Sequence, residues 1–168
     1  TENYNLHAFG GKGMEYTFTS CSKEETKRLG SFLSSLFERG DVVLLKGDLG
    51  AGKTTFVSGV GEGLKTEEEV ISPTFNIMKC YFKGRIPMYH IDAYRLENQN
   101  IELGLEEFIE GDGVCLIEWP DFIKPLLPDC ALTLTLRNKG DDLREITLLG
   151  EGKHFEEIVS KVKEKFHD

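Results

Sequence analysis

Residues 42–55 of the chain are VVLLKGDLGAGKTT, an apolar run followed by a glycine-rich stretch. Val42–Leu45 is short and wholly apolar, which is typical of a central parallel strand covered on both faces. Residues 47–54 match the pattern GxxxxGK followed by Ser or Thr, which requires a strand before the glycines and a helix after them. We expect that helix to run from about Lys53 to Leu64. The stretch therefore predicts a phosphate-binding loop, or P-loop, after a buried strand.

The residue types in this loop suit a nucleoside triphosphate. Gly47, Gly50 and Gly52 let the backbone amides curve round a phosphate without a side chain in the way. The Lys53 ammonium can reach the β- and γ-phosphates and assist catalysis, and the Thr54 hydroxyl can coordinate Mg²⁺. The expected nucleotide-binding residues are Gly47, Asp48, Leu49, Gly50, Ala51, Gly52, Lys53, Thr54 and Thr55. The expected cofactors are ATP and Mg²⁺.

Two acidic residues stand where predicted strands end. Val114–Ile117 is a second wholly apolar run and is followed by Glu118, whereas the more amphipathic strand Tyr89–Ile91 is followed by Asp92. A cation on the phosphates needs a carboxylate at the end of a neighbouring strand. We assign Glu118 to the metal, together with Thr54, because its strand is the more uniformly apolar. Asp92 is then free to orient the attacking water or a partner group, although either acid could be a solvated carboxylate.

Two loop motifs have both a functional and a structural interpretation. Thr74, in Ser72-Pro73-Thr74-Phe75, has the position of a switch threonine that senses the γ-phosphate, or lies in a plain turn set by Pro73. Asn138-Lys139-Gly140-Asp141 spells NKxD, the guanine-binding pattern of GTPases. No strand ends in the DxxG that GTPases also use, and the segment fits a polar hairpin turn. We therefore favour ATP, with a GTPase as the alternative.

Strands and helices alternate along one predicted domain. Ser22 and Glu25 form a capping box, which begins a helix that we expect to end at Gly40. The other expected elements are a strand at 16–19, a hairpin of strands 78–82 and 86–91, a short helix at 103–109, a hairpin around 132–136 and 146–148, and a closing helix around 155–166. This order predicts a single α/β P-loop NTPase domain with three layers, a mixed, largely parallel central sheet and antiparallel hairpins. We expect residues 1–13 to be a leader or flexible tail and residues 14–168 to form the domain.

Composition narrows the class of partner. The chain has 168 residues and a net charge of −9, which argues against gripping RNA or DNA over its whole surface. Its cysteines, Cys21, Cys80, Cys115 and Cys130, are widely spaced and form no CxxC pair. They predict free thiols in a reducing cytoplasm. No apolar run approaches the roughly 20 residues of a membrane span, so no membrane partner is expected.

Three further motifs accompany the P-loop stretch of residues 47–56. They are Ser72-Pro73-Thr74-Phe75, His90-Ile91-Asp92-Ala93-Tyr94-Arg95-Leu96 and Ile117-Glu118-Trp119-Pro120. A P-loop alone is shared by a vast superfamily, but the four motifs in this order and spacing are highly specific. From about Tyr16 to Leu149 the chain resembles the bacterial TsaE family, also called YjeE.

The resemblance implies a function that the composition of the chain does not indicate. TsaE proteins are small ATPases needed to form threonylcarbamoyladenosine next to the anticodon of tRNA. They act with the TsaB–TsaD complex, in which TsaD transfers the threonylcarbamoyl group, and ATP hydrolysis is thought to reset that complex between rounds. The expected partner is therefore TsaB–TsaD, with tRNA met indirectly through it, and ATP turnover is expected to be slow without the partner.

The resemblance also implies roles for individual residues. Thr54 and Glu118 would hold Mg²⁺, and Asp92 would serve hydrolysis or coupling to the partner. The loop that carries His90, Tyr94 and Arg95 would face the partner. Lys23, at the start of the first helix, and the turn at Gly140 would border the base. Trp119 would shape the site or fill the core.

Two other classes of function share the P-loop. A phosphotransferase would need a second substrate pocket, usually under a basic lid, but Arg95, Arg137 and Arg144 are scattered along the chain. A nucleotide-dependent binding module would bind ATP and turn it over negligibly without a partner. Phosphate-release assays with and without candidate acceptors distinguish these classes from an ATPase.

Overall fold

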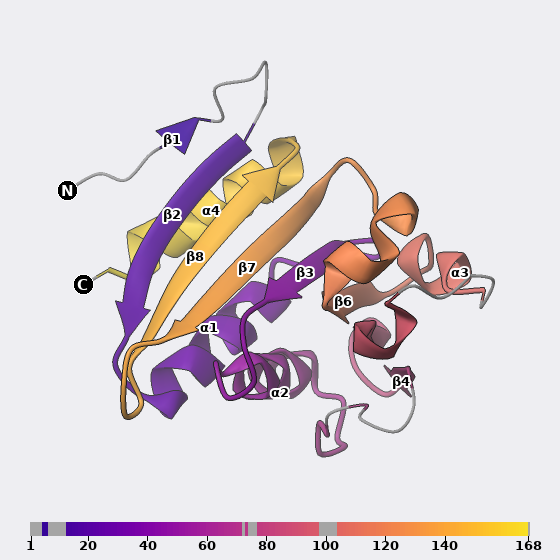
Figure 1. Cartoon of the computed structure of the whole chain (residues 1–168), viewed down its shortest axis with the longest axis horizontal. Coiled ribbons are helices and arrows are strands. Elements are labelled where there is room, and N and C mark those ends of the chain that lie inside the picture. The colour runs from indigo at the N-terminus through magenta and orange to yellow at the C-terminus, as the bar shows by residue number, and fades with distance from the viewer. Residues whose placement is uncertain (1–4, 7–12, 72, 74–76, 98–103, 168) are drawn as a thin grey trace.

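The computed structural model describes residues 5–6, 13–71, 73, 77–97 and 104–167, and its centre is one eight-stranded sheet (Figure 1). The strands are β1 (Asn5–Leu6), β2 (Gly13–Ser20), β3 (Val42–Lys46), β4 (Met78–Tyr81), β5 (Met88–Asp92), β6 (Val114–Glu118), β7 (Ala131–Asn138) and β8 (Arg144–Glu151). They lie in the order β1-β2-β8-β7-β3-β6-β5-β4.

The centre of the sheet is parallel and its flanks are antiparallel. Strand β3 pairs in parallel with both β6 and β7, and β5 pairs in parallel with β6. The hairpins β4–β5 and β7–β8, and the pairing of β2 with β8, are antiparallel. The predicted mixed α/β architecture is confirmed. Parallel order brings the carboxyl ends of β3, β5 and β6 to one edge of the sheet, which positions the residues that follow them.

Helices cover the two faces of the sheet. They are α1 (Lys23–Ser34), α2 (Lys53–Leu64), α3 (Glu106–Ile109) and α4 (Lys153–Lys165), with 3₁₀ segments η1 (Tyr94–Leu96) and η2 (Pro120–Leu126). Val43 and Leu45 pack in one core cluster with α1, α2 and α4, whereas Val42 packs in a second cluster with residues of η1, α3 and η2. Successive side chains of a strand point to opposite faces, so these clusters are the two faces of the sheet.

The first predicted helix is shorter than expected. It begins as predicted, with the Ser22 hydroxyl accepting from the Glu25 N–H at 3.0 Å, but it ends at Ser34 rather than at Gly40. The Arg85 guanidinium donates to the carbonyls of Ser34 and Phe37 at 2.7 and 2.8 Å, which satisfies the free end of the helix. The predicted end of the helix was wrong because the residue that satisfies it, Arg85, lies in the connection between β4 and β5. A pattern in the sequence around the helix does not report a contact with a residue so far along the chain.

Other boundaries differ in smaller ways. Strand β5 begins at Met88 rather than residue 86, and α3 begins at Glu106 rather than residue 103, which lies outside the described part of the chain. Of the segment expected to be a leader or tail, Gly13 begins β2, and Asn5 and Leu6 pair with β2. The division at residues 13 and 14 stays a prediction. Within the described residues, no helix is long and apolar enough to cross a membrane.

Helices α1 and α2 approach each other backbone to backbone. A methyl group on Gly30 of α1 would collide with the Phe56 carbonyl oxygen, and one on Gly59 of α2 would collide with the Lys27 carbonyl oxygen. Such contacts leave no room for a side chain at Gly30 or Gly59. Because α2 continues from the glycine-rich stretch, this packing fixes where that stretch lies.

We predict that Gly59→Ala lowers the free energy of unfolding by about 1–3 kcal/mol, because the added methyl forces the helix backbones apart. Helix propensity alone would raise stability by up to about 1 kcal/mol, so the sign separates the two effects. Urea denaturation measures it. Gly61→Ala is the comparison, since the three atoms nearest to its methyl belong to side chains, of Val70, Thr66 and Met88, and the Val70 side chain at 2.7 Å would have to shift rather than a helix backbone. Equal or greater stability of Gly59→Ala would contradict the packing argument.

Candidate active site

A cleft of about 970 Å³ opens at the carboxyl edge of the parallel strands. Its lining residues are Lys23, Thr26, Leu49, Gly50, Gly52, Lys53, Thr54, Thr55, Pro73, Ile77, Asp92, Tyr94, Arg95, Glu118, Trp119, Asp142 and Arg144. Most of the side chains singled out from the sequence therefore meet in one place. Gly47 and Asp48 line a smaller hollow of about 130 Å³ that shares Trp119 with the cleft, and Ala51 is buried beneath the loop.

The glycine-rich loop (residues 47–54) has the predicted strand–turn–helix setting, between β3 and α2. Gly47 and Gly52 have φ of 146° and 102°, a region that favours glycine. A methyl on Gly47 would also lie 2.5 Å from the Leu136 carbonyl oxygen. These glycines are therefore required by the backbone path. The N-terminus of α2 lies at Lys53, beside the cleft, so its free N–H groups and positive dipole end favour an anion there.

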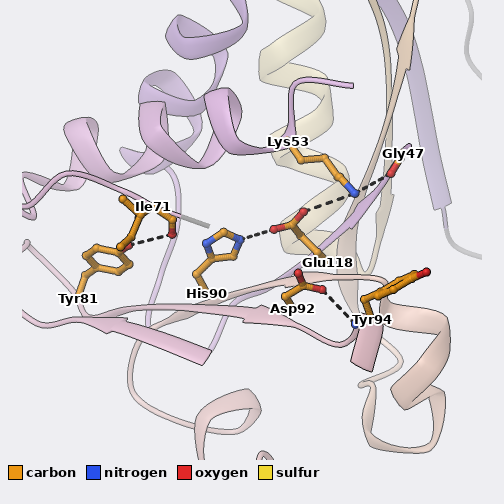
Figure 2. A network of polar contacts seen from close by, with 8 residues as sticks. All are labelled: Gly47, Lys53, Ile71, Tyr81, His90, Asp92, Tyr94 and Glu118. Atoms are coloured by element: carbon orange, nitrogen blue, oxygen red, sulfur yellow. Dashed lines mark hydrogen bonds and ion pairs between the residues drawn. The ribbon is translucent and has the colours of Figure 1, made fainter. Parts of the chain in front are cut away.

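A chain of polar contacts crosses the floor of the cleft (Figure 2). The Lys53 ammonium donates to the Gly47 carbonyl oxygen at 2.6 Å and lies 3.4 Å from Glu118 Oε1. The other carboxylate oxygen, Oε2, lies 2.7 Å from His90 Nε2. Lys53 and Glu118 are only 7% and 6% exposed, and His90 is fully buried. The loop, helix α2 and strands β5 and β6 are thus joined through one buried carboxylate.

The environment keeps Glu118 ionised. Burial raises the pKa of its carboxyl group, but the hydrogen bond and attraction of His90, together with the Lys53 ammonium, lower it further than burial raises it. The net pKa lies below its ordinary value. Glu118 therefore presents a carboxylate to the cleft at neutral pH.

These residues meet the requirements of a magnesium ion. Mg²⁺ takes hard oxygen ligands and is usually held by one or two carboxylates together with substrate phosphates. Glu118 supplies an ionised carboxylate, and Thr54 lines the same cleft and supplies a hydroxyl. The donor set therefore fits the ion, with room in the cleft for phosphates and water.

Asp92 lies beside Glu118 but in a different environment. The two residues are partners in the β5–β6 ladder, and Asp92 is half-buried at the cleft wall. Its Oδ1 accepts from the Tyr94 N–H at 3.0 Å (Figure 2). Asp92 thus lies beside Glu118 at the end of the neighbouring strand and lines the cleft.

Trp119 forms a wall of the cleft, although it also packs against the core. Its φ of 56° is unusual for a residue with a side chain. Its ring lies 4.8 Å from the Lys53 ammonium, and ring contacts of 5.1 and 5.9 Å join it to Tyr94 and Phe122. The sequence left Trp119 open between the site and the core, and it serves both.

The Asn138–Asp141 segment is the tip of the β7–β8 hairpin, as favoured from the sequence. The Asn138 side-chain oxygen accepts from the Gly140 N–H at 2.9 Å and from Arg144 at 3.2 Å. Arg144 also donates to the Gly50 carbonyl oxygen at 3.2 Å, which ties the turn to the glycine-rich loop. Arg144 and Asp142 line the cleft, whereas Gly140 does not.

Sequence reasoning missed Asp142 and Arg144 as site residues. They reach the cleft because β7 lies beside β3, and no local sequence pattern reports that pairing. Thr26, one turn after Lys23 on α1, was also missed; it lines the cleft and bonds to Ser20 at 2.7 Å. Lys23 itself lines the cleft as expected.

One expected position is wrong and another lies outside the described residues. His90 was expected in a loop facing a partner, but it lies inside β5, fully buried between β4 and β6. A side chain without exposed surface cannot contact a partner. Thr74 falls in the part of the chain that the structure does not describe. Nearby, Pro73 lines the cleft, and the Tyr81 hydroxyl accepts from the Ile71 N–H at 3.2 Å.

Comparison with known proteins gives a consistent identification. Residues 20–146 match the family model described as "Threonylcarbamoyl adenosine biosynthesis protein TsaE". A "tRNA threonylcarbamoyladenosine biosynthesis protein TsaE" of Bacillus subtilis is 44% identical over 143 residues, which cover 85% of this chain and 90% of the relative. The protein of the same name from Treponema pallidum is 43% identical over 131 residues, or 77% of this chain and 96% of the relative.

A solved structure agrees with these sequence matches. The crystal structure of Bacillus subtilis YdiB superimposes with a TM-score of 0.79 at 38% sequence identity, over 90% of this chain and 96% of that one. The shared fold and the matched stretch include the glycine-rich loop, Asp92, Glu118 and Trp119. The chain therefore belongs to the TsaE family of threonylcarbamoyl adenosine biosynthesis proteins.

Proposed function

We propose that this protein binds ATP with Mg²⁺ in the cleft and hydrolyses it, acting with the TsaB–TsaD complex in forming threonylcarbamoyladenosine next to the anticodon of tRNA. The observation that carries the proposal is the buried pair of Lys53 and Glu118, 3.4 Å apart, directly behind the glycine-rich loop. An ammonium and a carboxylate at this position are the two charges that a magnesium triphosphate needs.

The loop and Lys53 bind the phosphates. Backbone amides of residues 47–54 would surround the β-phosphate, and the α2 N-terminus would add its positive end. The hydrogen bond from Lys53 to the Gly47 carbonyl oxygen holds the ammonium over the loop, within reach of the γ-phosphate. Arg144 braces the loop from outside through the Gly50 carbonyl oxygen.

Thr54 and Glu118 would hold the magnesium ion. When bound, Mg²⁺ neutralises charge that develops on the β- and γ-phosphate oxygens. Glu118 is suited to this because its carboxylate is ionised and anchored by His90. Asp92 is placed to orient the attacking water, or to contact the partner, because its carboxylate lies at the cleft wall.

The rim of the cleft suits a partner that closes over it. Leu49, on the glycine-rich loop, is 98% exposed, and Tyr94 is 56% exposed. A protein surface covering these apolar groups would exclude water from the phosphates and accelerate turnover, which we expect to be slow in the isolated protein. The net charge of −9 agrees with tRNA being held by TsaB–TsaD rather than by this chain. The free cysteines fit a cytoplasmic location.

A phosphotransferase is less well supported. Such enzymes usually bring arginines over the phosphates from a lid. Here Arg137 pairs with Glu145 on the hairpin and Arg144 bonds within its own turn, while Arg95 lines the cleft wall. Phosphate release that rises with added TsaB–TsaD, and not with small-molecule acceptors, tests the proposed ATPase. Turnover that depends on an acceptor would replace it.

For the nucleotide, we predict that ATP and ADP bind with magnesium and that GTP binds at least about tenfold more weakly, a gap of roughly 1.4 kcal/mol. The physical reason is that the Asn138 side-chain oxygen is already engaged by Gly140 and Arg144 in the hairpin turn. Calorimetric titration measures the three affinities. Equal or tighter binding of GTP would reverse the assignment and make residues 138–141 a base-binding site.

For the metal, we predict that Glu118→Gln weakens the magnesium-dependent part of nucleotide binding by about tenfold or more, since a neutral amide replaces the anionic ligand. Binding in EDTA should stay nearly unchanged, because the loop amides remain. Lys53→Ala should weaken binding under both conditions. Calorimetry with and without Mg²⁺ checks this, and an intact magnesium dependence in Glu118→Gln, with loss of it in Asp92→Asn, would show that the two acids have exchanged roles.

For catalysis, we predict that Asp92→Ala folds normally and binds ATP but loses ATP turnover with TsaB–TsaD by about 100-fold or more, as expected for loss of a residue that orients water. Multi-round tRNA modification should stop as well. If Asp92 orients water, the variant still binds the partner; if Asp92 is a contact, binding weakens. Wild-type turnover and repeated modification would remove Asp92 from the mechanism.

A further inference from the structure

His90 is a buried polar residue in an apolar strand. It lies within β5. Two neighbours on the same face are fully buried apolar residues: Met88 on β5, and Leu116, which is the ladder partner of His90 on β6. This face carries α1 and α2, so the ring points toward the helix that begins at Lys53. Strand and helix packing alone would be served by another apolar side chain.

The two ring nitrogens of His90 differ in their hydrogen bonding. Nε2 lies 2.7 Å from Glu118 Oε2, whereas Nδ1 is buried and has no hydrogen-bond partner within the described part of the chain. A buried polar atom without a partner loses its hydrogen bonds to water and gains none in return, which is destabilising. Within the described part of the chain, the polar contact that the ring makes is therefore the one with Glu118.

That contact decides how the Glu118 carboxylate is oriented. One oxygen faces His90, and the other lies 3.4 Å from the Lys53 ammonium (Figure 2). Because a carboxylate accepts only, Nε2 is the donor of this bond. Without the bond from His90, the Glu118 carboxylate would be free to rotate and bring both oxygens onto Lys53. The carboxylate lone pairs would then be unavailable to a cation, and the Lys53 ammonium would be drawn away from the phosphates.

We propose that His90 is a positioning residue for the metal site: it holds one oxygen of Glu118 so that the other remains directed at the cation and at Lys53. This inference rests on the proposed function, since it takes Glu118 as the magnesium ligand. His90 thus acts within the protein, on Glu118, and not on a partner as the sequence motif suggested. Hydrogen-bonded partners behind a metal ligand typically change metal affinity by about 10–100-fold when removed.

The test compares two amides that differ in reach. In His90→Gln the side-chain amide can extend to the position of Nε2 and donate to Glu118, whereas in His90→Asn it is too short to do so. The readout is the ratio of ADP affinities with Mg²⁺ and with EDTA, measured by calorimetry, with a thermal melt for each variant. Tyr89→Phe is the matched control, because it removes a different β5 hydrogen bond, to Asp112 at 2.7 Å.

We expect His90→Asn to lose about tenfold or more of the magnesium-dependent gain in ADP affinity and to bind normally in EDTA. His90→Gln should stay within about threefold of wild type, and Tyr89→Phe should be unchanged. Combining His90→Asn with Glu118→Gln should add no further loss, because His90 acts through Glu118.

Three results would overturn the inference: equal magnesium ratios in His90→Asn and wild type, equal losses in His90→Asn and His90→Gln, or a parallel loss in EDTA. The last result would make His90 a purely structural residue. Glu118→Gln alone reports on the proposed function. If it loses magnesium dependence while His90→Asn does not, the proposed metal site stands and the positioning role of His90 falls.

Discussion

The cleft depends on two opposite charges that the fold keeps from water. Lys53 and Glu118 lie 3.4 Å apart and are 7% and 6% exposed. An unpaired ion at such depth is penalised by several kcal/mol, so each residue offsets the cost of burying the other. Such pairs contribute little net stability compared with apolar residues of the same size. What this pair provides is chemical: a cation and an anion held ready at the point where phosphates and a metal would meet.

The sheet order and the helix packing make this pair possible. Lys53 follows β3 and Glu118 ends β6, and these strands are far apart in sequence but adjacent and parallel in the sheet. Parallel order alone brings their carboxyl ends together. The direction of α2 is then fixed by its backbone contact with α1 at Gly30 and Gly59. A small displacement of α2 would move the ammonium relative to the carboxylate, so glycines distant from the cleft determine its electrostatics.

Local sequence patterns predicted the parts of the site that depend on local structure. The strand, loop and helix of residues 42–64, and the acids at the ends of two strands, are each set by a few consecutive residues. The errors have non-local causes. The end of α1 at Ser34 is capped by Arg85, and Arg144 reaches the glycine-rich loop only through strand pairing. His90 was misplaced because a motif identifies neighbours along the chain and does not report burial.

Glu118 and Asp92 end neighbouring strands and are paired in one ladder, but their surroundings suit them to different chemical roles. Glu118 is held on both oxygens, by His90 and Lys53, and its pKa is lowered, so it is a fixed charge suited to a cation. Asp92 is half-buried, accepts from the Tyr94 N–H and is followed by a short 3₁₀ turn at the cleft wall. A partner that presses on this turn could reorient Asp92 without disturbing Glu118. Under the proposed function, the less constrained Asp92 is therefore the acid open to a contact at the cleft wall, while nucleotide and metal binding would rest on the buried charges.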